Sequence, residues 1–166
     1  GAVFTNLWRS RAGFHGRLAV AGNRLWLTGP GVGLVRFEGT NQVRWTRQQG
    51  LPSDDTGTVA AAPDGSVWFA VGNNGAGGAV RFDGTNFFLL TEKEGLHTGE
   101  VTCIGIVPDG RVWFGTAEGT VARFDGRSFT YFDTSSALSG REYSAANANG
   151  HCNDIQQGPD GATWFG

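Results

Sequence analysis

A tryptophan that follows a turn of small and polar residues recurs four times along this chain. The copies are Trp26, Trp68, Trp113 and Trp164, and successive tryptophans are 42, 45 and 51 residues apart. Self-similarity at a period of about 20–50 residues indicates a repeat architecture in which each repeat is one supersecondary unit. The chain is therefore predicted to be an array of similar units.

Two further motifs keep their place relative to each tryptophan. Pro-Asp-Gly precedes three of the tryptophans, at 63–65, 108–110 and 159–161. Arg-Phe, then Glu or Asp, then Gly, follows the first three tryptophans, at 36–39, 81–84 and 123–126. Three motifs in one fixed order exclude chance, so the repeat reflects the fold.

Each repeat divides into four short apolar runs separated by turn signals. In the third repeat these runs are 101–107, 112–116, 120–124 and 128–132. Runs of about five residues rich in Val, Phe, Trp and Thr predict strands. Pro-Asp-Gly forms a tight turn because proline fixes φ, aspartate bonds nearby backbone and glycine accepts a positive φ. Four antiparallel strands per repeat predict an all-β fold, a β-propeller with one blade per repeat.

The 166 residues are assigned to a single propeller domain or half-propeller. The predicted blades are about 15–48, 54–91, 98–132, and 150–166 plus 1–9. In the last blade, the C-terminal segment gives the two inner strands and the N-terminal segment the two outer ones. Joining the two halves removes open strand edges, which otherwise template aggregation. The chain therefore holds four blade equivalents.

The repeated motifs resemble those of known repeat families. The segments 50–53 (Gly-Leu-Pro-Ser), 63–69 (Pro-Asp-Gly-Ser-Val-Trp-Phe) and 81–84 (Arg-Phe-Asp-Gly) resemble the two-component regulator propeller repeat. The resemblance implies the sensor portion of a bacterial two-component regulator, in the periplasm or outside the cell. Pro-Asp-Gly-x-x-Trp-Phe-Gly also looks like the blades of streptogramin (virginiamycin B) lyase. The shared residues are those that build blades, so the resemblance is specific for the fold and weak for the function.

Three ring arrangements fit four blade equivalents. The chain closes on itself, or two chains exchange halves in an eight-bladed ring, or the chain is a piece of a longer propeller. The families that the chain resembles usually form seven-bladed rings. The angle between neighbouring blades in an eight-bladed ring is closer to the angle in a seven-bladed ring than the angle in a four-bladed ring is. We therefore favour the two-chain ring, a homodimer of a common isologous kind.

Composition excludes several function classes. The net charge is −2, which argues against nucleic acid as a partner because nucleic-acid binding requires a clustered basic face. No apolar run approaches the length that spans a membrane. Cys103 and Cys152 are too few for a disulfide scaffold and lack metal-ligand spacing, so we predict two half-buried thiols rather than a disulfide. No cofactor and no metal are predicted.

The candidate site lies on one of the two faces of the propeller. Tight turns lie on one face, whereas the other carries the variable loops, including 72–78 and 135–150. Insertions are tolerated where scaffolds present function. The polar residues predicted to bind a ligand there are His15, Asp54, Asp55, His97, Glu100, Arg141, Tyr143, His151 and Asn153. The competing interpretation is that they are ordinary solvated loop residues.

The leading functional hypothesis is a non-catalytic module that binds a small polar ligand or a protein partner on this variable face. The first alternative is a Mg²⁺-dependent lyase similar to streptogramin lyase, with His151 and Glu100 as the nearest candidates for its base pair. The chain has no clear match to the catalytic strands of that family. The second alternative is an orphan propeller fragment or scaffold without a ligand.

The repeated tryptophans and arginines have a structural interpretation. Trp26, Trp68, Trp113 and Trp164 keep the period of the blade, so we predict that they form the core between blades. Arg36, Arg81 and Arg123 keep the same period, which favours a repeated ion pair or cation–π contact over an anion site.

Overall fold

The fold is built of antiparallel sheets whose strands follow one another in chain order. The computed structural model describes residues 15–72, 77–97, 100–117, 119–133, 152 and 154–166. The first sheet contains β1 (Arg17–Ala21), β2 (Arg24–Gly29), β3 (Gly33–Glu38) and β4 (Asn41–Trp45). The second contains β5 (Thr56–Ala61), β6 (Val67–Val71), β7 (Gly78–Phe82) and β8 (Phe87–Leu90).

The third sheet repeats this order, and the fourth has two strands among the described residues. The third contains β9 (Val101–Ile106), β10 (Val112–Thr116), β11 (Thr120–Phe124) and β12 (Phe129–Asp133). The fourth contains β13 (Ile155–Gln157) and β14 (Thr163–Phe165). The prediction of an all-β propeller with four-stranded antiparallel blades is confirmed. Residues 1–9, predicted to complete the last blade, lie outside the described residues.

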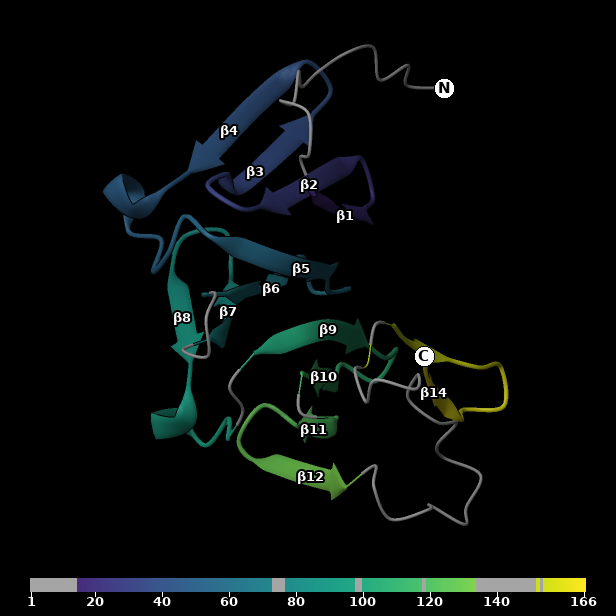
Figure 1. Ribbon diagram of the computed structural model, residues 1–166. Helices are drawn as coiled ribbons and strands as arrows, with labels where there is room; N and C mark the ends of the chain where they lie inside the picture. Colours follow the sequence, from purple (N-terminus) through teal and green to yellow (C-terminus); the bar gives the residue numbers. More distant parts are fainter. Residues whose placement is uncertain (1–14, 73–76, 98–99, 118, 134–151, 153) are drawn as a thin grey trace.

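The sheets succeed one another around their first strands (Figure 1). β1 contacts β5, β5 contacts β9, and β9 contacts β13. The first strands therefore form the inner edge of the array, and each chain segment between sheets returns from an outer strand to the next inner strand. This is the radial order of propeller blades.

The tight turns form as the Pro-Asp-Gly motif predicts. Gly65 and Gly110 have φ of 85° and 87°, in the left-handed region that glycine adopts at little cost. The Asp64 carboxylate accepts a hydrogen bond from the Ser66 N–H at 2.9 Å, which holds the turn from the side-chain end.

The core lies between sheets. Trp26 clusters with Val59 of β5, Trp68 with Ile104 of β9, and Trp113 with Ile155 of β13. These three tryptophans are 2%, 5% and 9% exposed, as predicted for a core between blades. Trp164 is 52% exposed, which differs from the prediction because no sheet is described on its side of β14.

The opposite end of the array shows the complementary surface. Leu18 and Val20 of β1 are 61% and 70% exposed. Val59 and Ile104, in the equivalent register to Leu18 on β5 and β9, are buried against the preceding sheet.

Cys103 and Cys152 lie side by side at the boundary between the third and fourth sheets. Both are free, as predicted, but they are buried rather than half-buried, because they fill the boundary between two sheets. A Cβ added to Gly115 would lie within 2.6 Å of both sulfur atoms, so the glycine opens the space that the two thiols fill. No helix in the described part of the chain is long and apolar enough to cross a membrane.

Candidate functional site

The connections between strands separate the molecule into two faces. The tight-turn face carries the β1–β2, β5–β6, β9–β10 and β13–β14 turns. The variable-loop face carries the β2–β3 and β6–β7 connections and the longer β4–β5 and β8–β9 connections. The last two each contain a short 3-10 helix, η1 (Arg47–Gln49) and η2 (Glu92–Glu94), drawn as coils in Figure 1.

The two helical connections share one construction. Thr46 and Thr91 cap η1 and η2, and the side chains of Gln49 and Glu94 return to the capping backbone N–H groups. A glycine with positive φ then ends each helix, at Gly50 and Gly95. The next residues, Leu51 and Leu96, are buried. The connections are therefore anchored loops that present the residues after each leucine.

His97, the residue after Leu96, is exposed and held by its neighbours. Its backbone N–H donates to the Tyr131 hydroxyl oxygen at 2.8 Å, and the Tyr131 hydroxyl donates to the Gly95 carbonyl. Its ring lies 5.6 Å from the Tyr131 ring, between centroids. Burial raises the pKa of Tyr131, so the hydroxyl remains a donor at neutral pH. Sequence reasoning missed Tyr131, since 34 residues separate it from His97.

Asp54 and Asp55 use their carboxylates within the protein. Asp54 accepts from the Arg47 N–H at 2.8 Å, which ties the end of the connection to η1. Asp55 accepts from the Gly31 N–H at 2.9 Å, which ties it to the β2–β3 connection of the neighbouring sheet. Both residues hold loop backbone in place.

The other candidates divide into two groups. His15 and Glu100 are exposed. No hydrogen bond or ion pair joins His15, Asp54, Asp55, His97 and Glu100 to one another in the part of the chain that the structure describes. Nor does any group of three His, Cys, Asp or Glu there suit a metal ion. The remaining candidates, Arg141, Tyr143, His151 and Asn153, lie outside the described residues.

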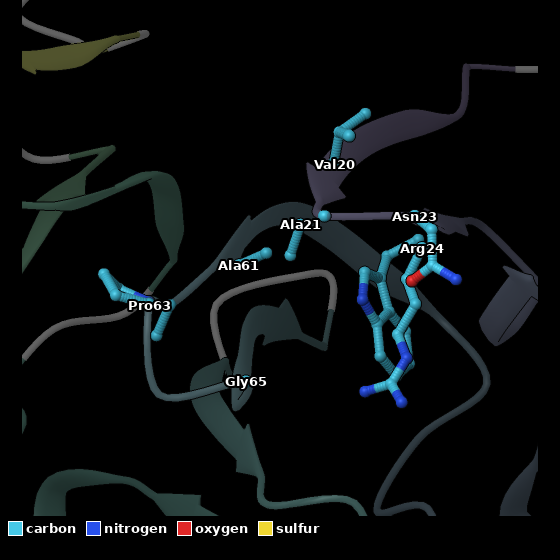
Figure 2. Close-up of a pocket in the computed structure, with 10 residues that line it drawn as sticks. Val20, Ala21, Asn23, Arg24, Ala61, Pro63 and Gly65 are labelled. Carbon is cyan, nitrogen blue, oxygen red and sulfur yellow. The ribbon is translucent and has the colours of Figure 1, made fainter. Parts of the chain in front are cut away.

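Grooves between sheets open on the tight-turn face. The first, between the first and second sheets, is lined by Val20, Arg24, Trp26 and Pro63 among others and has a volume of about 420 Å³ (Figure 2). The second, between the second and third sheets, has about 440 Å³. The third, between the third and fourth sheets, has about 90 Å³. Sequence reasoning placed no site here.

The register shows that these grooves are equivalent. Trp26, Trp68 and Trp113 line the first, second and third grooves in turn. Each tryptophan is paired across its sheet with the repeated arginine, Arg36, Arg81 or Arg123. The predicted ion-pair and cation–π contacts of these arginines are present in the structure. Arg81 pairs with Asp64, and the guanidinium carbons of Arg36 and Arg123 lie over tryptophan rings at 5.9 and 5.6 Å.

Comparison with known families decides the kind of repeat. Residues 95–118 match the family described as "Two component regulator propeller". This segment is similar to a two-component regulator propeller repeat. It runs from Gly95 at the end of η2 through β9 and β10, so it includes one helical connection and one tryptophan strand. The predicted resemblance to the two-component regulator propeller repeat is confirmed, whereas the similarity to streptogramin lyase stays a prediction. No curated protein matches the chain in sequence.

Solved structures share the fold. The extracellular domain of BT3049 from B. thetaiotaomicron, described as a hybrid two component system, has a TM-score of 0.65 and 20% identity over 91% of this chain. PorZ, a surface component of the type-IX secretion system of Porphyromonas gingivalis, has a TM-score of 0.64 and 14% sequence identity over 90% of this chain. The structure of YCF48 bound to D1 peptide has a TM-score of 0.59 and 15% sequence identity over 97% of this chain. The chain covers 20%, 23% and 48% of those chains.

Proposed function

We propose that this chain is part of a non-catalytic sensor propeller, placed outside the cytoplasm, that binds a polar ligand or a protein partner on its variable-loop face. The two-component regulator propeller repeat supports the sensor role. Two similar structures are extracellular domains of proteins described as hybrid two component systems, which supports the location. YCF48 is bound to a peptide, so the fold can carry a recognition surface.

The observation that carries the proposal is the way His97 is presented. The residue is exposed, yet its backbone is fixed by Tyr131 and by the buried Leu96. A fixed group loses little conformational entropy when it binds, and this favours recognition. A neutral imidazole offers one donor and one acceptor nitrogen to a polar ligand.

Signalling then follows from differential binding. The His97 loop rests on Tyr131 of β12, whereas Glu100 begins the approach to β9 of the same sheet. A ligand that binds both His97 and Glu100 favours the loop arrangement in which it contacts both residues over an arrangement in which it does not. Such a ligand shifts the population only by its difference in affinity for the two arrangements.

The test is a binding screen with defined probes. Amino acids, dipeptides and mono- and disaccharides are screened by thermal shift, and each hit is measured by calorimetry. His97→Ala is expected to weaken binding of a hit about tenfold while leaving the unfolding midpoint unchanged, because the ring is exposed. Arg127→Ala, in a tight turn on the other face, is the matched control. A hit whose affinity is equal in the unmodified protein, His97→Ala and His15→Ala would assign binding to another surface.

A further inference from the structure

The grooves on the tight-turn face are equivalent in position but differ in charge. In the first sheet the Arg36 Nε lies 3.9 Å from the Glu38 carboxylate. In the second, the Arg81 Nη2 lies 3.3 Å from the Asp64 carboxylate. In these sheets the repeated arginine therefore has an acidic partner within its own sheet, although Glu38 also pairs with Arg24 at 3.3 Å.

The third sheet departs from this arrangement. Asp109 is the equivalent of Asp64, but its carboxylate pairs with Arg111 at 3.2 Å. Arg111 stands where the second sheet has Ser66, whose hydroxyl donates to Asp64 at 2.6 Å. Arg123 is left over the rings of Trp113 and Phe132, each at 5.6 Å, and pairs with no carboxylate among the described residues. The repeated arginine of this sheet, Arg123, is therefore unneutralised.

The lining of the third groove is correspondingly polar and lacks acid. Asp64 and Asp109 line the second groove, whereas no carboxylate of the described residues lines the third. Thr163 stands where the second groove has Val112. The side chain of Gln157 adds an amide, one N–H of which donates to the Gly161 carbonyl at 3.0 Å. Beside it, the indole N–H of Trp113 is buried without an acceptor among the described residues.

From these residues we infer that the groove between the third and fourth sheets binds a small oxyanion, of the carboxylate, phosphate or sulfate class. The guanidinium of Arg123 presents a planar fork of donors that matches such oxygens, and half-burial against two rings strengthens its charge–charge interactions. The volume of about 90 Å³ holds about three groups of the size of water, at about 30 Å³ each, which fits the head of an oxyanion.

The site is independent of the proposed function. It lies on the tight-turn face, at the boundary that β13 and β14 form with β9 and β10, whereas His97 lies on the other face. An anion bound there would hold the third and fourth sheets together, because Arg123 comes from one sheet and Gln157 and Thr163 from the other.

The experiment follows the indole N–H signals of the full chain by ¹H–¹⁵N NMR, with Trp113→Phe to assign the Trp113 signal. Sodium phosphate and, separately, sodium acetate are titrated against sodium chloride of matched ionic strength. Phosphate or acetate is expected to shift the Trp113 signal saturably, and chloride is not. Arg123→Gln and Gln157→Glu are each expected to weaken binding about tenfold or more, since one removes the charged donor and the other supplies a competing carboxylate.

Arg81→Gln is the matched control, because Arg81 holds the equivalent position in the second groove and already has an acidic partner. The affinity of the Arg81→Gln variant for phosphate is expected to equal that of the unmodified protein. Saturation by acetate alone would assign the site to carboxylates within the proposed class. Absence of a saturable shift with both anions would overturn the inference, as would equal weakening in Arg81→Gln. Gln157 is exposed, so Gln157→Glu keeps the test decisive even if Arg123→Gln fails to fold.

Discussion

The hydroxyl of Thr56, on the first strand of the second sheet, is hydrogen-bonded to the backbone of Gly29 in the first sheet. It accepts from the Gly29 N–H at 2.9 Å and lies 3.1 Å from the Gly29 carbonyl oxygen. The Gly33 carbonyl lies 2.8 Å away. One buried side chain therefore satisfies backbone groups of the neighbouring sheet.

Thr56→Val is expected to destabilise the protein by about 1–3 kcal/mol, because it leaves the buried Gly29 N–H without a partner. Urea unfolding measures the change. Thr58→Val, on the same strand, is the matched control, since the structure shows no side-chain hydrogen bond for Thr58. Equal loss in the two variants would show that the hydroxyl of Thr56 contributes nothing specific.

Asp55 links the same two sheets on the variable-loop face. Asp55→Ala removes the acceptor for the Gly31 N–H and is expected to cost about 1 kcal/mol, whereas Asp55→Asn keeps a side-chain acceptor and costs less. Thermal unfolding of both variants measures the difference. Identical midpoints for the two would contradict the assigned role.

Stability is expected to fall in acid because of two aspartates in equivalent turns. Asp83 accepts from the Asn86 and Thr85 N–H groups, and Asp125 from the Ser128 and Arg127 N–H groups; these hydrogen bonds lower the pKa of each carboxyl. Their folded pKa values lie below the unfolded value of about 3.9, so the stabilisation is present above that pH and is lost as pH falls through the folded values.

The variant with both Asp83→Asn and Asp125→Asn is therefore expected to lose less stability than the unmodified protein between about pH 5 and pH 2. Unfolding midpoints at pH 7, 4, 3 and 2.5 measure the slope. Parallel curves for the two proteins would assign the acid sensitivity elsewhere.

The paired thiols are expected to be unreactive while the protein is folded. The hydrogen bond to Cys152 and burial raise the pKa of Cys103, so it remains a protonated thiol. The same hydrogen bond lowers the pKa of Cys152, so the protection of that sulfur rests on its burial. A thiol reagent should label Cys103 and Cys152 only after unfolding. Gly115→Ala is expected to speed labelling, because its Cβ has no room beside the two sulfurs. Labelling of the unmodified native protein at the rate of a free cysteine would contradict this packing.

The two-chain ring is a prediction about mass in solution. Light scattering is expected to give about twice the chain mass of 17.6 kDa. The exposed face of Leu18 and Val20 matches the positions that cover Trp26 and Trp68 elsewhere, so it suits the exposed Trp164 of a second copy. Leu18→Asp with Val20→Asp should then yield single chains. A mass of one chain for the unmodified protein would exclude exchange.

Sequence reasoning located the strands because the signals for turns are local. The third repeat was predicted at 101–107, 112–116, 120–124 and 128–132, and its strands differ from these bounds by at most one residue. A glycine that adopts positive φ and an aspartate that bonds its own turn act within four residues. A short repeat therefore contains all that is needed to place them.

The side-chain partners at the candidate site could not be predicted in the same way. Gly31 and Asp55 are 24 residues apart, and His97 and Tyr131 are 34 apart. No period links such pairs, because they depend on how loops of different length meet. The pairing of Arg111 with Asp109 also escaped prediction, since it arises from one residue that differs from its counterpart, Ser66.

The packing of each tryptophan on the following sheet gives the array a direction. Trp68 contributes to the boundary between the second and third sheets, whereas the boundary before it depends on Trp26. Stability is thus expected to behave as a sum over nearest neighbours, as in a one-dimensional lattice. Damage at one tryptophan would loosen the junction that follows and leave the preceding junction intact. Partial unfolding should accordingly proceed sheet by sheet.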